Sequence, residues 1–354
     1  MANTTVFMDG SVYSPVDPYA TALVFSDSMV EWVGSDAGAQ SIYDDTMNKV
    51  KLEGELLTPA FVHGGCFVSS QVELERFIDT LLNRGYSAAT IFVPPHFSRD
   101  AFQLAAKKNF KLYPYIRIKN LTDFEVLSTD IYGVQVVGES RHLQDLIQST
   151  LSSQKKLSFI AVNPQEIATF CQELARLTDA QRAHLAPRID GLQGLSIELN
   201  EVCKELGIAL GFSSYLQNNN SIAHAVSSGA HIFLGSDPHE SSRLLGWELA
   251  LEYVVRSQPQ QQISARATFN ALTRGIYRAL GETNPFYGQL APQSPADIAR
   301  WKVTELMVQT ANDSVAAWST DPRARIPLLP ALEIGKLPVL NGLFIAGQVA
   351  IEAS

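Results

Sequence analysis

Short apolar runs that favour β-strands recur at a regular interval through the middle of the chain. The first begins near residue 57 and the last near residue 231, so 174 residues span seven intervals of about 25 residues each. One strand, one helix and two short loops fit this length. The eight runs begin near Leu57, Ala89, Leu112, Tyr132, Leu157, Arg188, Gly207 and His231.

Amphipathic patterns typical of helices lie between these runs. Residues 71–84 place their apolar side chains near one face, and Gly85 ends the pattern. Residues 164–177 repeat it, with Pro164 in the first turn. The side chains predicted to face inward are Val72, Leu74, Phe77, Ile78, Leu81 and Leu82 in the first helix, and Ile167, Phe170, Cys171 and Leu174 in the second.

Eight strands that alternate with helices predict an α/β protein built on a (β/α)8 TIM-type barrel, over residues 57–285. A doubly wound sheet is the alternative. Neither the G-x-G-x-x-G nor the G-x-x-x-x-G-K-[ST] nucleotide fingerprint occurs in the chain, so nothing in the sequence favours that alternative.

The two ends of the chain have a different pattern, with short strands and turn signals. Residues 21–25 run through a turn at residues 26–28 into residues 29–34, and residues 343–349 form a similar hairpin pattern. Chain termini often lie close together. We therefore expect residues 1–56 and 286–354 to pair into one small β-sandwich domain beside the barrel.

Composition and charge exclude several classes of function. Hydrophobic residues make up 46% of the chain and charged residues 18%, which is ordinary for a folded protein. The net charge of −9 without a Lys/Arg cluster argues against a nucleic-acid partner. No apolar run is long enough to cross a bilayer, and residues 1–10 do not resemble a signal peptide.

The three cysteines are odd in number and widely spaced, which favours free thiols in a reducing compartment. They are Cys66, Cys171 and Cys203. We therefore expect a cytoplasmic protein whose partner is a small molecule. Self-association into a homo-oligomer is left open.

Several segments, in order along the chain, resemble the amidohydrolase superfamily, in particular its large and poorly defined set of bacterial members. Residues 22–25 (ALVF), 30–34 (VEWVG) and 57–62 (LTPAFV) resemble the opening of such a protein. Residues 234–238 (LGSDP) are similar to its last barrel strand, and residues 263–275 (ISARATFNALTRG) to the helix that follows. Residues 288–298 (GQLAPQSPADI) resemble the return to the sandwich, with Ser294 where a second glycine is usual.

The resemblance implies a metal-dependent hydrolase that acts on carbon–nitrogen bonds of a small molecule. Zinc or a similar divalent metal would activate a water, and an Asp at the end of the last strand would take its proton. Most positions that should hold the metal are occupied by residues that cannot. Gly65 and Phe67 fall on the two histidines of the first strand, and Gly191 falls on the histidine of the sixth. The fourth and fifth strands lack the usual lysine and histidine, so we expect no metal cofactor.

Polar residues at the predicted strand ends are the remaining candidates for a site at the barrel mouth. Asp237 and His239, after the eighth strand, are the candidate catalytic pair, although both could equally cap the next segment. The candidate ligand-binding residues are His63, His96, Arg117, Glu139 and Asp190, of which His63 and His96 could equally be structural.

Three functions remain open at this point. The chain could be a pseudoenzyme that binds a small molecule or a partner, a metal-independent hydrolase with a rebuilt site, or a metal-dependent hydrolase whose ligands lie elsewhere. In a site without metal, the carboxylates of Glu139, Asp190 and Asp237 would repel one another. A histidine, Arg117 or a cationic ligand could balance them. We therefore expect either a raised carboxylate pKa or a cationic ligand group, with Arg117 as the internal partner.

Overall fold

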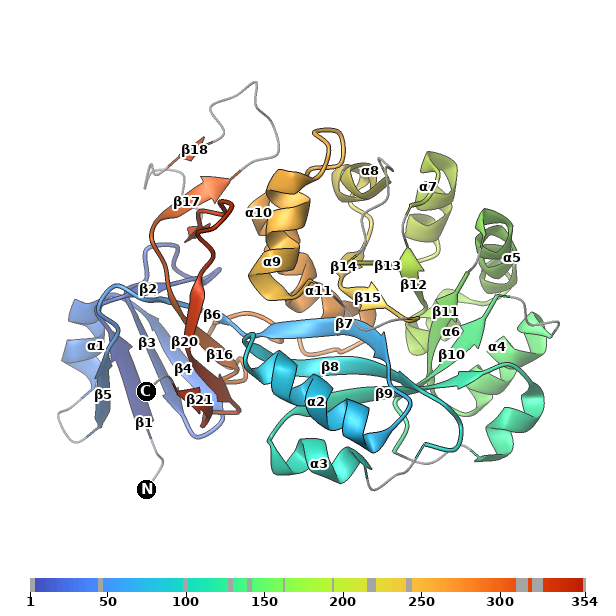
Figure 1. The fold of residues 1–354 in the computed structure, drawn as a ribbon, viewed down its shortest axis with the longest axis horizontal. Coiled ribbons are helices and arrows are strands. Elements are labelled where there is room, and N and C mark those ends of the chain that lie inside the picture. Colours follow the sequence, from blue (N-terminus) through green and yellow to red (C-terminus); the bar gives the residue numbers. More distant parts are fainter. Residues whose placement is uncertain are drawn as a thin grey trace.

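A computed structural model describes residues 4–43, 47–97, 101–126, 130–138, 142–161, 163–192, 194–214, 221–239, 244–309, 318–319 and 327–352. A parallel β/α barrel forms its larger part, and smaller sheets lie beside it, with both chain ends on their side (Figure 1). No helix within the described ranges has the length and apolar character needed to span a membrane.

The barrel strands follow chain order around the sheet, and each pairs in parallel with its neighbour. They are β7 (Phe61–Phe67), β8 (Tyr86–Val93), β9 (Lys111–Ile118), β10 (Gly133–Val137), β11 (Lys156–Ile160), β12 (Arg188–Leu192), β13 (Ala209–Phe212), β14 (Ile232–Leu234) and β15 (Ser236–Asp237). Gly235, with a φ of 72°, separates β14 from β15. Because β14 pairs with β13 and β15 pairs with β7, these two short strands together act as the eighth strand and join the barrel's ends.

The predicted strand positions are confirmed apart from the first. Residues 56–59 form a separate strand, β6, and the first barrel strand begins only at Phe61. The apolar run continues through both strands, so its start marks β6 rather than the barrel.

Helices cover the outside of the barrel. They are α2 (Gln71–Leu82), α3 (Ala101–Lys107), the 3-10 helix η1 (Leu121–Val126), α4 (Leu143–Ser152), α5 (Pro164–Ala175), α6 (Asp179–Leu185), α7 (Ile197–Glu205), α8 (Ser221–Ser228), α9 (Gly246–Leu251), the π-helical segment η2 (Glu252–Arg256), α10 (Ala265–Ala271) and α11 (Arg274–Ala279). The two helices predicted in detail are confirmed as α2 and α5, capped by Ser70 and Asn163, whose side chains accept from backbone N–H groups. Val72 was wrongly placed inward, since 58% of it is exposed.

Two apolar layers hold the barrel together. The outer one lies between strands and helices, and it contains the inward residues of α2 and α5 together with alternate strand residues such as Phe61, Ile91 and Phe159. The inner layer contains the other alternate residues, such as Val62, Phe92 and Phe233. Helix α11 adds Ile276 and Tyr277 to this inner layer and its C-cap residue adds Leu280, so this segment fills the barrel from its lower end.

The ends of the chain form two sheets beside the barrel. One contains only N-terminal strands, in the order β4 (Met29–Gly34), β3 (Ala22–Ser26), β1 (Thr4–Met8), β5 (Asn48–Lys51), with α1 (Asp36–Ile42) after β4. The other joins both ends of the chain, in the order β2 (Ser11–Val12), β6 (Leu56–Pro59), β16 (Ile298–Lys302), β20 (Val339–Ile345), β21 (Gln348–Glu352). Both predicted hairpins, β3–β4 and β20–β21, are confirmed.

One apolar cluster contains residues of both these sheets. The ring of Phe344 on β20 lies 5.4 Å from that of Phe7 on β1 and 5.7 Å from that of Phe25 on β3. A third small sheet orders β18 (Trp318–Ser319), β17 (Leu306–Gln309) and β19 (Leu329–Pro330). All three cysteines are buried and free, as predicted, and the sulfurs of Cys171 and Cys203 lie 3.7 Å apart.

Candidate functional site

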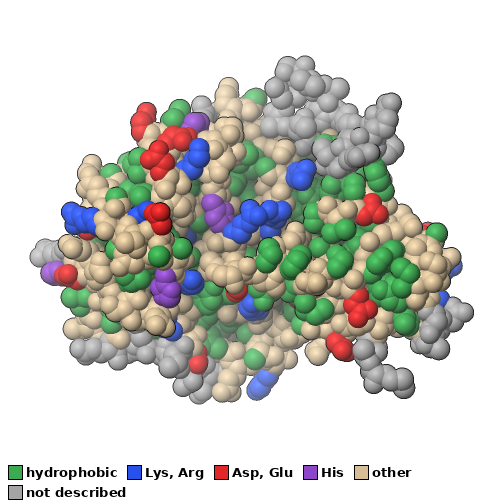
Figure 2. Space-filling model, turned by 180° about the vertical axis from the view of Figure 1, so that it is seen from behind, with side chains coloured by type: hydrophobic (Ala, Val, Ile, Leu, Met, Phe, Trp, Pro, Cys, Tyr) green, Lys and Arg blue, Asp and Glu red, His purple; other side chains and the backbone are tan. Residues whose placement is uncertain are grey.

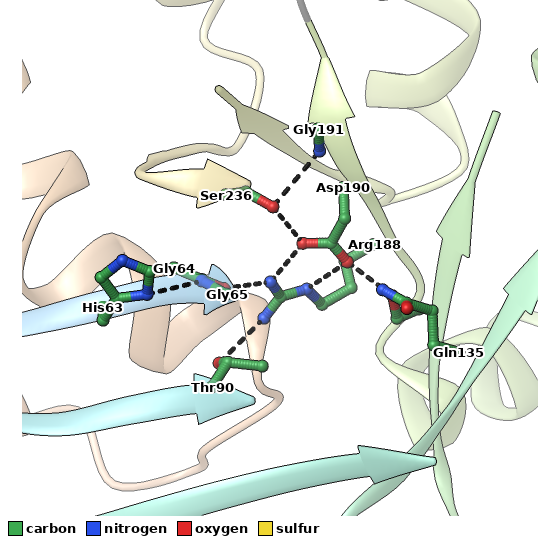
Figure 3. A network of polar contacts seen from close by, with 10 residues as sticks. His63, Gly64, Gly65, Thr90, Gln135, Arg188, Asp190, Gly191 and Ser236 are labelled. Carbon is green, nitrogen blue, oxygen red and sulfur yellow. Dashed lines mark hydrogen bonds and ion pairs between the residues drawn. The ribbon is translucent and has the colours of Figure 1, made fainter. Parts of the chain in front are cut away.

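A fully buried arginine occupies the centre of the barrel. Arg188 is the first residue of β12, and its side chain is 0% exposed. Its Nε donates to Asp190 Oδ2 at 3.0 Å, and its Nη2 donates to Asp190 Oδ1 and to the carbonyl of Gly64. Residues two apart on a strand point to the same side, so the order Arg-x-Asp brings the two charges together. The barrel centre therefore holds an ion pair that lies within hydrogen-bonding distance of the first strand (Figure 3).

Hydroxyl groups satisfy the rest of the Asp190 carboxylate. Ser158 Oγ on β11 donates to Oδ2 at 2.6 Å, and Ser236 Oγ on β15 donates to Oδ1 at 2.5 Å. With the two bonds from Arg188, the carboxylate accepts four hydrogen bonds, which is about its full capacity. The carboxylate is thus bound by three strands and has little capacity left for a metal or a substrate.

Aromatic rings and small residues shape the space around the guanidinium. Its central carbon lies 4.3 Å from the ring centre of Phe233 and 5.6 Å from that of Tyr115. A Cβ at Gly65 would come within 2.5 Å of the Phe92 ring and 3.4 Å of Arg188 Nη2. A histidine at residue 65 therefore cannot coexist with this arrangement of Arg188 and Phe92.

The other two positions aligned with metal-binding histidines are also committed to packing. Gly191 has a φ of 77°, and a Cβ there would come within 2.8 Å of the Pro238 ring. The Phe67 ring centre lies 4.3 Å from the guanidinium carbon of Arg117. Gly65 therefore leaves room for Arg188, and Phe67 lies against Arg117. Gly191 allows the close approach of Pro238 in the segment after β15.

Arg117 lies at the carboxyl end of β9, at the barrel mouth. Its Nε donates to Gln135 Oε1 at 2.9 Å, and its Nη2 donates to the Pro238 carbonyl at 2.5 Å. Gln135 Nε2 donates in turn to Ser158 Oγ at 3.1 Å, which links Arg117 to Asp190 through two neutral side chains. Burial lowers the pKa of Arg117 to about 10, although the charge of Asp190 opposes this shift.

His63 faces the helix layer and not the barrel centre. Its ring lies 5.0 Å from that of Phe77 on α2 and 6.0 Å from that of Tyr86 on β8, and its Nδ1 accepts from the Gly65 N–H at 3.2 Å. Burial lowers its pKa to about 4, Arg188 adds to the shift and Asp237 opposes it. His63 is therefore neutral at pH 7.

The remaining predicted residues are in different environments. Asp237 is buried and accepts from Ser213 Oγ at 2.5 Å and from the Ser214 N–H at 2.9 Å, so it binds the end of β13. His239 is exposed two residues later, and His96 is exposed in the turn after β8. Glu139 lies outside the described residues.

Arg117 is the internal partner that the sequence suggested for the carboxylates, and for Asp190 the structure shows a different one. The direct partner of Asp190 is Arg188, and Arg117 reaches it only through Gln135 and Ser158. The alternation pattern contained a signal for the missed residues. Gln135, Ser158 and Arg188 are polar residues within apolar strand runs, at positions that face the barrel interior.

A divalent metal does not fit the described part of this site. Asp190 already accepts four hydrogen bonds, and Asp237 accepts from Ser213 and Ser214, the two residues that follow β13. In the described ranges, no three His, Cys, Asp or Glu side chains are grouped closely enough to hold a metal ion.

Solved structures share this fold at low sequence identity. A triazine hydrolase variant superposes with a TM-score of 0.69 at 12% identity, covering 99% of this chain and 95% of that one. N-isopropylammelide isopropylaminohydrolase from Burkholderia multivorans gives 0.67 at 12% identity, covering 98% of each chain. A mutant atrazine chlorohydrolase from Arthrobacter aurescens, solved as a complex with zinc and atraton, gives 0.68 at 13% identity, covering 98% and 95%.

This chain has the amidohydrolase fold. No protein-family model matches its sequence, and no curated protein matches it. The resemblance found in the sequence is thus confirmed at the level of the fold.

Proposed function

We propose that this protein is a pseudoenzyme that binds a small molecule at the carboxyl end of its barrel and performs no metal-dependent hydrolysis. The buried Arg188–Asp190 ion pair carries this proposal. It places the Arg188 guanidinium inside the barrel, next to the first strand, and it occupies the Asp190 carboxylate that a metal or ligand could otherwise use. Function depends on the site and not on the fold, so hydrolase-like architecture does not imply hydrolysis.

The test is the metal content of protein purified without chelators. We expect well under one equivalent of zinc or manganese per chain, and a melting temperature that EDTA does not change. Near one equivalent of tightly held metal that is lost in an Asp190→Asn variant would contradict the proposal. The Glu333→Gln variant is the matched control, because Glu333 is a carboxylate in a surface pair with Lys336.

A metal-independent hydrolase with a rebuilt site is the second candidate. Its support is the fold shared with structures named as hydrolases, together with the exposed position of His239 close to Asp237. In this proposal Asp237 and His239 are catalytic, and His63, His96, Arg117, Glu139 and Asp190 bind substrate. Carbon–nitrogen bond cleavage by metal-free protein, lost in His239→Ala, would favour it over the pseudoenzyme.

We also propose that the two ends of the chain, residues 1–56 and 286–354 as predicted from the sequence together with residues 57–59 of β6, form a composite β-sandwich domain beside a barrel domain of the residues between them. The pairing of β6 with β16 and the apolar cluster shared by the two sheets support this division.

A further inference from the structure

We infer that the barrel mouth recognises an anionic group, a carboxylate or a phosphate, through Arg117. This inference deepens the proposed ligand-binding function and rests on it. It gives the chemical class of the ligand, which neither the fold nor the similar structures assign.

The Arg117 guanidinium is held in a fixed orientation by neutral groups. Gln135 accepts from Nε, the Pro238 carbonyl accepts from Nη2, and the Phe67 ring lies 4.3 Å from the guanidinium carbon. A guanidinium carries five N–H groups, and these bonds use two, which leaves three. Arg117 has no ion pair with any acidic side chain in the described ranges, whereas Arg188, the other arginine of this network, pairs with Asp190.

The positive charge of Arg117 is not balanced within the hydrogen-bonded network that contains it. Within the hydrogen-bonded network, Arg188 balances Asp190, and Gln135 and Ser158 are neutral, so the network has a net charge of +1 at neutral pH. Asp237, another carboxylate at this end of the barrel, accepts from Ser213 and Ser214. Holding a partly buried charge without a counterion costs free energy, which a bound anion would offset.

This arrangement reverses the expectation from sequence. A cationic ligand would be needed if the carboxylates lacked a counterion, but Asp190 already has one in Arg188. Among the described residues of this network, the charge that has no ion-pair partner is positive. A planar guanidinium matches a carboxylate or a phosphate through paired hydrogen bonds, so these are the groups that Arg117 is suited to bind.

A small anion fits this surface better than a polyanion. On the face shown in Figure 2, Lys and Arg side chains are interspersed with Asp and Glu side chains and with apolar patches, and the whole chain has a net charge of −9. A nucleic acid or another polyanion would need a broad basic surface. One fixed guanidinium at a barrel mouth instead suits a single anionic group on a small molecule.

The experiment compares benzoate with benzamide, and inorganic phosphate with chloride at equal ionic strength, by thermal unfolding of the metal-free protein. We expect benzoate or phosphate to raise the melting temperature and benzamide and chloride not to do so. In Arg117→Gln the apparent dissociation constant of the anion should rise at least ~10-fold. Arg84→Gln, which removes an exposed and paired arginine, should bind as the wild type does.

Three outcomes would overturn the inference. The first is that neither anion stabilises the wild type. The second is that benzamide stabilises it as well as benzoate does. The third is that Arg117→Gln shows the same stabilisation by the anion as the wild type. If Arg117→Gln fails to fold, Arg117→Lys replaces it. Lysine keeps the positive charge but lacks the paired N–H groups of a guanidinium. We therefore expect weaker binding of the anion, with the preference for benzoate over benzamide retained. Metal content measured on the same samples tests the proposed function separately. Stabilisation by benzamide alone would refute the anion inference but would still agree with a protein that binds a small molecule.

Discussion

The centre and the mouth of this barrel each contain an arginine, and the partners of the two arginines differ in charge. Arg188, at the centre, is fully buried, pairs with a carboxylate and lies against an aromatic ring. Arg117, at the mouth, is only partly buried and has a side-chain amide, a carbonyl and a ring as neighbours. The two are connected through Gln135, Ser158 and Asp190.

The difference separates a charge that holds the fold from the charge that we propose binds a ligand. A buried charge with a complete set of partners holds strands in place and has nothing left to offer a ligand. A half-buried charge with neutral partners is held in position at a cost that a ligand can offset. Both the pseudoenzyme proposal and the anion inference follow from this contrast, and the predictions below test it.

The largest effect is expected for Arg188→Met. This change leaves the Asp190 carboxylate buried without its cation, which costs about 3–5 kcal/mol of the free energy of unfolding. Denaturant unfolding measures it. The double variant Arg188→Met with Asp190→Leu should recover much of the loss, because neither charge remains. A single variant within about 1 kcal/mol of wild type would show that the pair is not structural.

The second prediction concerns pH, through His63 on the strand that Arg188 contacts. Its pKa is about 4 when folded and 6.5 when unfolded, so the unfolded state binds more protons between these values. Its stabilising contribution is complete above pH 6.5 and is lost as pH falls toward 4, by about 3 kcal/mol.

The matched variant for this test is His63→Gln, which keeps an acceptor for the Gly65 N–H. Its stability should fall less steeply with pH than that of wild type, while His239→Gln, at an exposed position, should follow wild type. His231, whose pKa burial also lowers, contributes equally to all three proteins. Parallel pH profiles for wild type and His63→Gln would refute the prediction.

The smallest effects distinguish Asp237 from His239 beside the mouth. Asp237→Asn should cost about 1–2 kcal/mol, because the buried carboxylate accepts from Ser213 and Ser214 and an amide can replace only part of this. His239→Ala, at an exposed position, should stay within about 0.5 kcal/mol. Thermal unfolding measures both. Equal effects would mean that Asp237 contributes no more to the fold than a surface residue.

The sequence predicted the barrel because periodicity reports which side of an element is buried. Eight apolar runs at a regular spacing, with helices such as α2 and α5 between them, determine this architecture almost alone. The hydrophobic pattern gave a wrong strand start where one apolar run forms strands of two sheets, β6 and β7. It also placed Val72 inward although this side chain is exposed.

The site was harder to predict because its partners come together only when the barrel closes. Arg188 and Asp190 are two residues apart, but Ser158 and Ser236 lie on other strands, and Gly64 contributes a carbonyl that no sequence pattern marks. The sequence predicted that the family's metal-binding histidines are replaced. It did not show that Gly65 is required by Phe92 and Arg188, or that Phe67 lies against Arg117.

Barrel closure by α11 has a consequence for the order in which the chain can fold during synthesis. The seam between β7 and β15 has only two paired positions, Ser236 with Gly65 and Asp237 with Cys66. Near the start of β7, the Val62 N–H donates to the carbonyl of Leu272, and Tyr277 of α11 packs into the inner layer. A ribosome must therefore release residues well beyond the last strand before the barrel can close. Until then a nascent chain would expose an open sheet edge, which is the form most prone to pair with another chain.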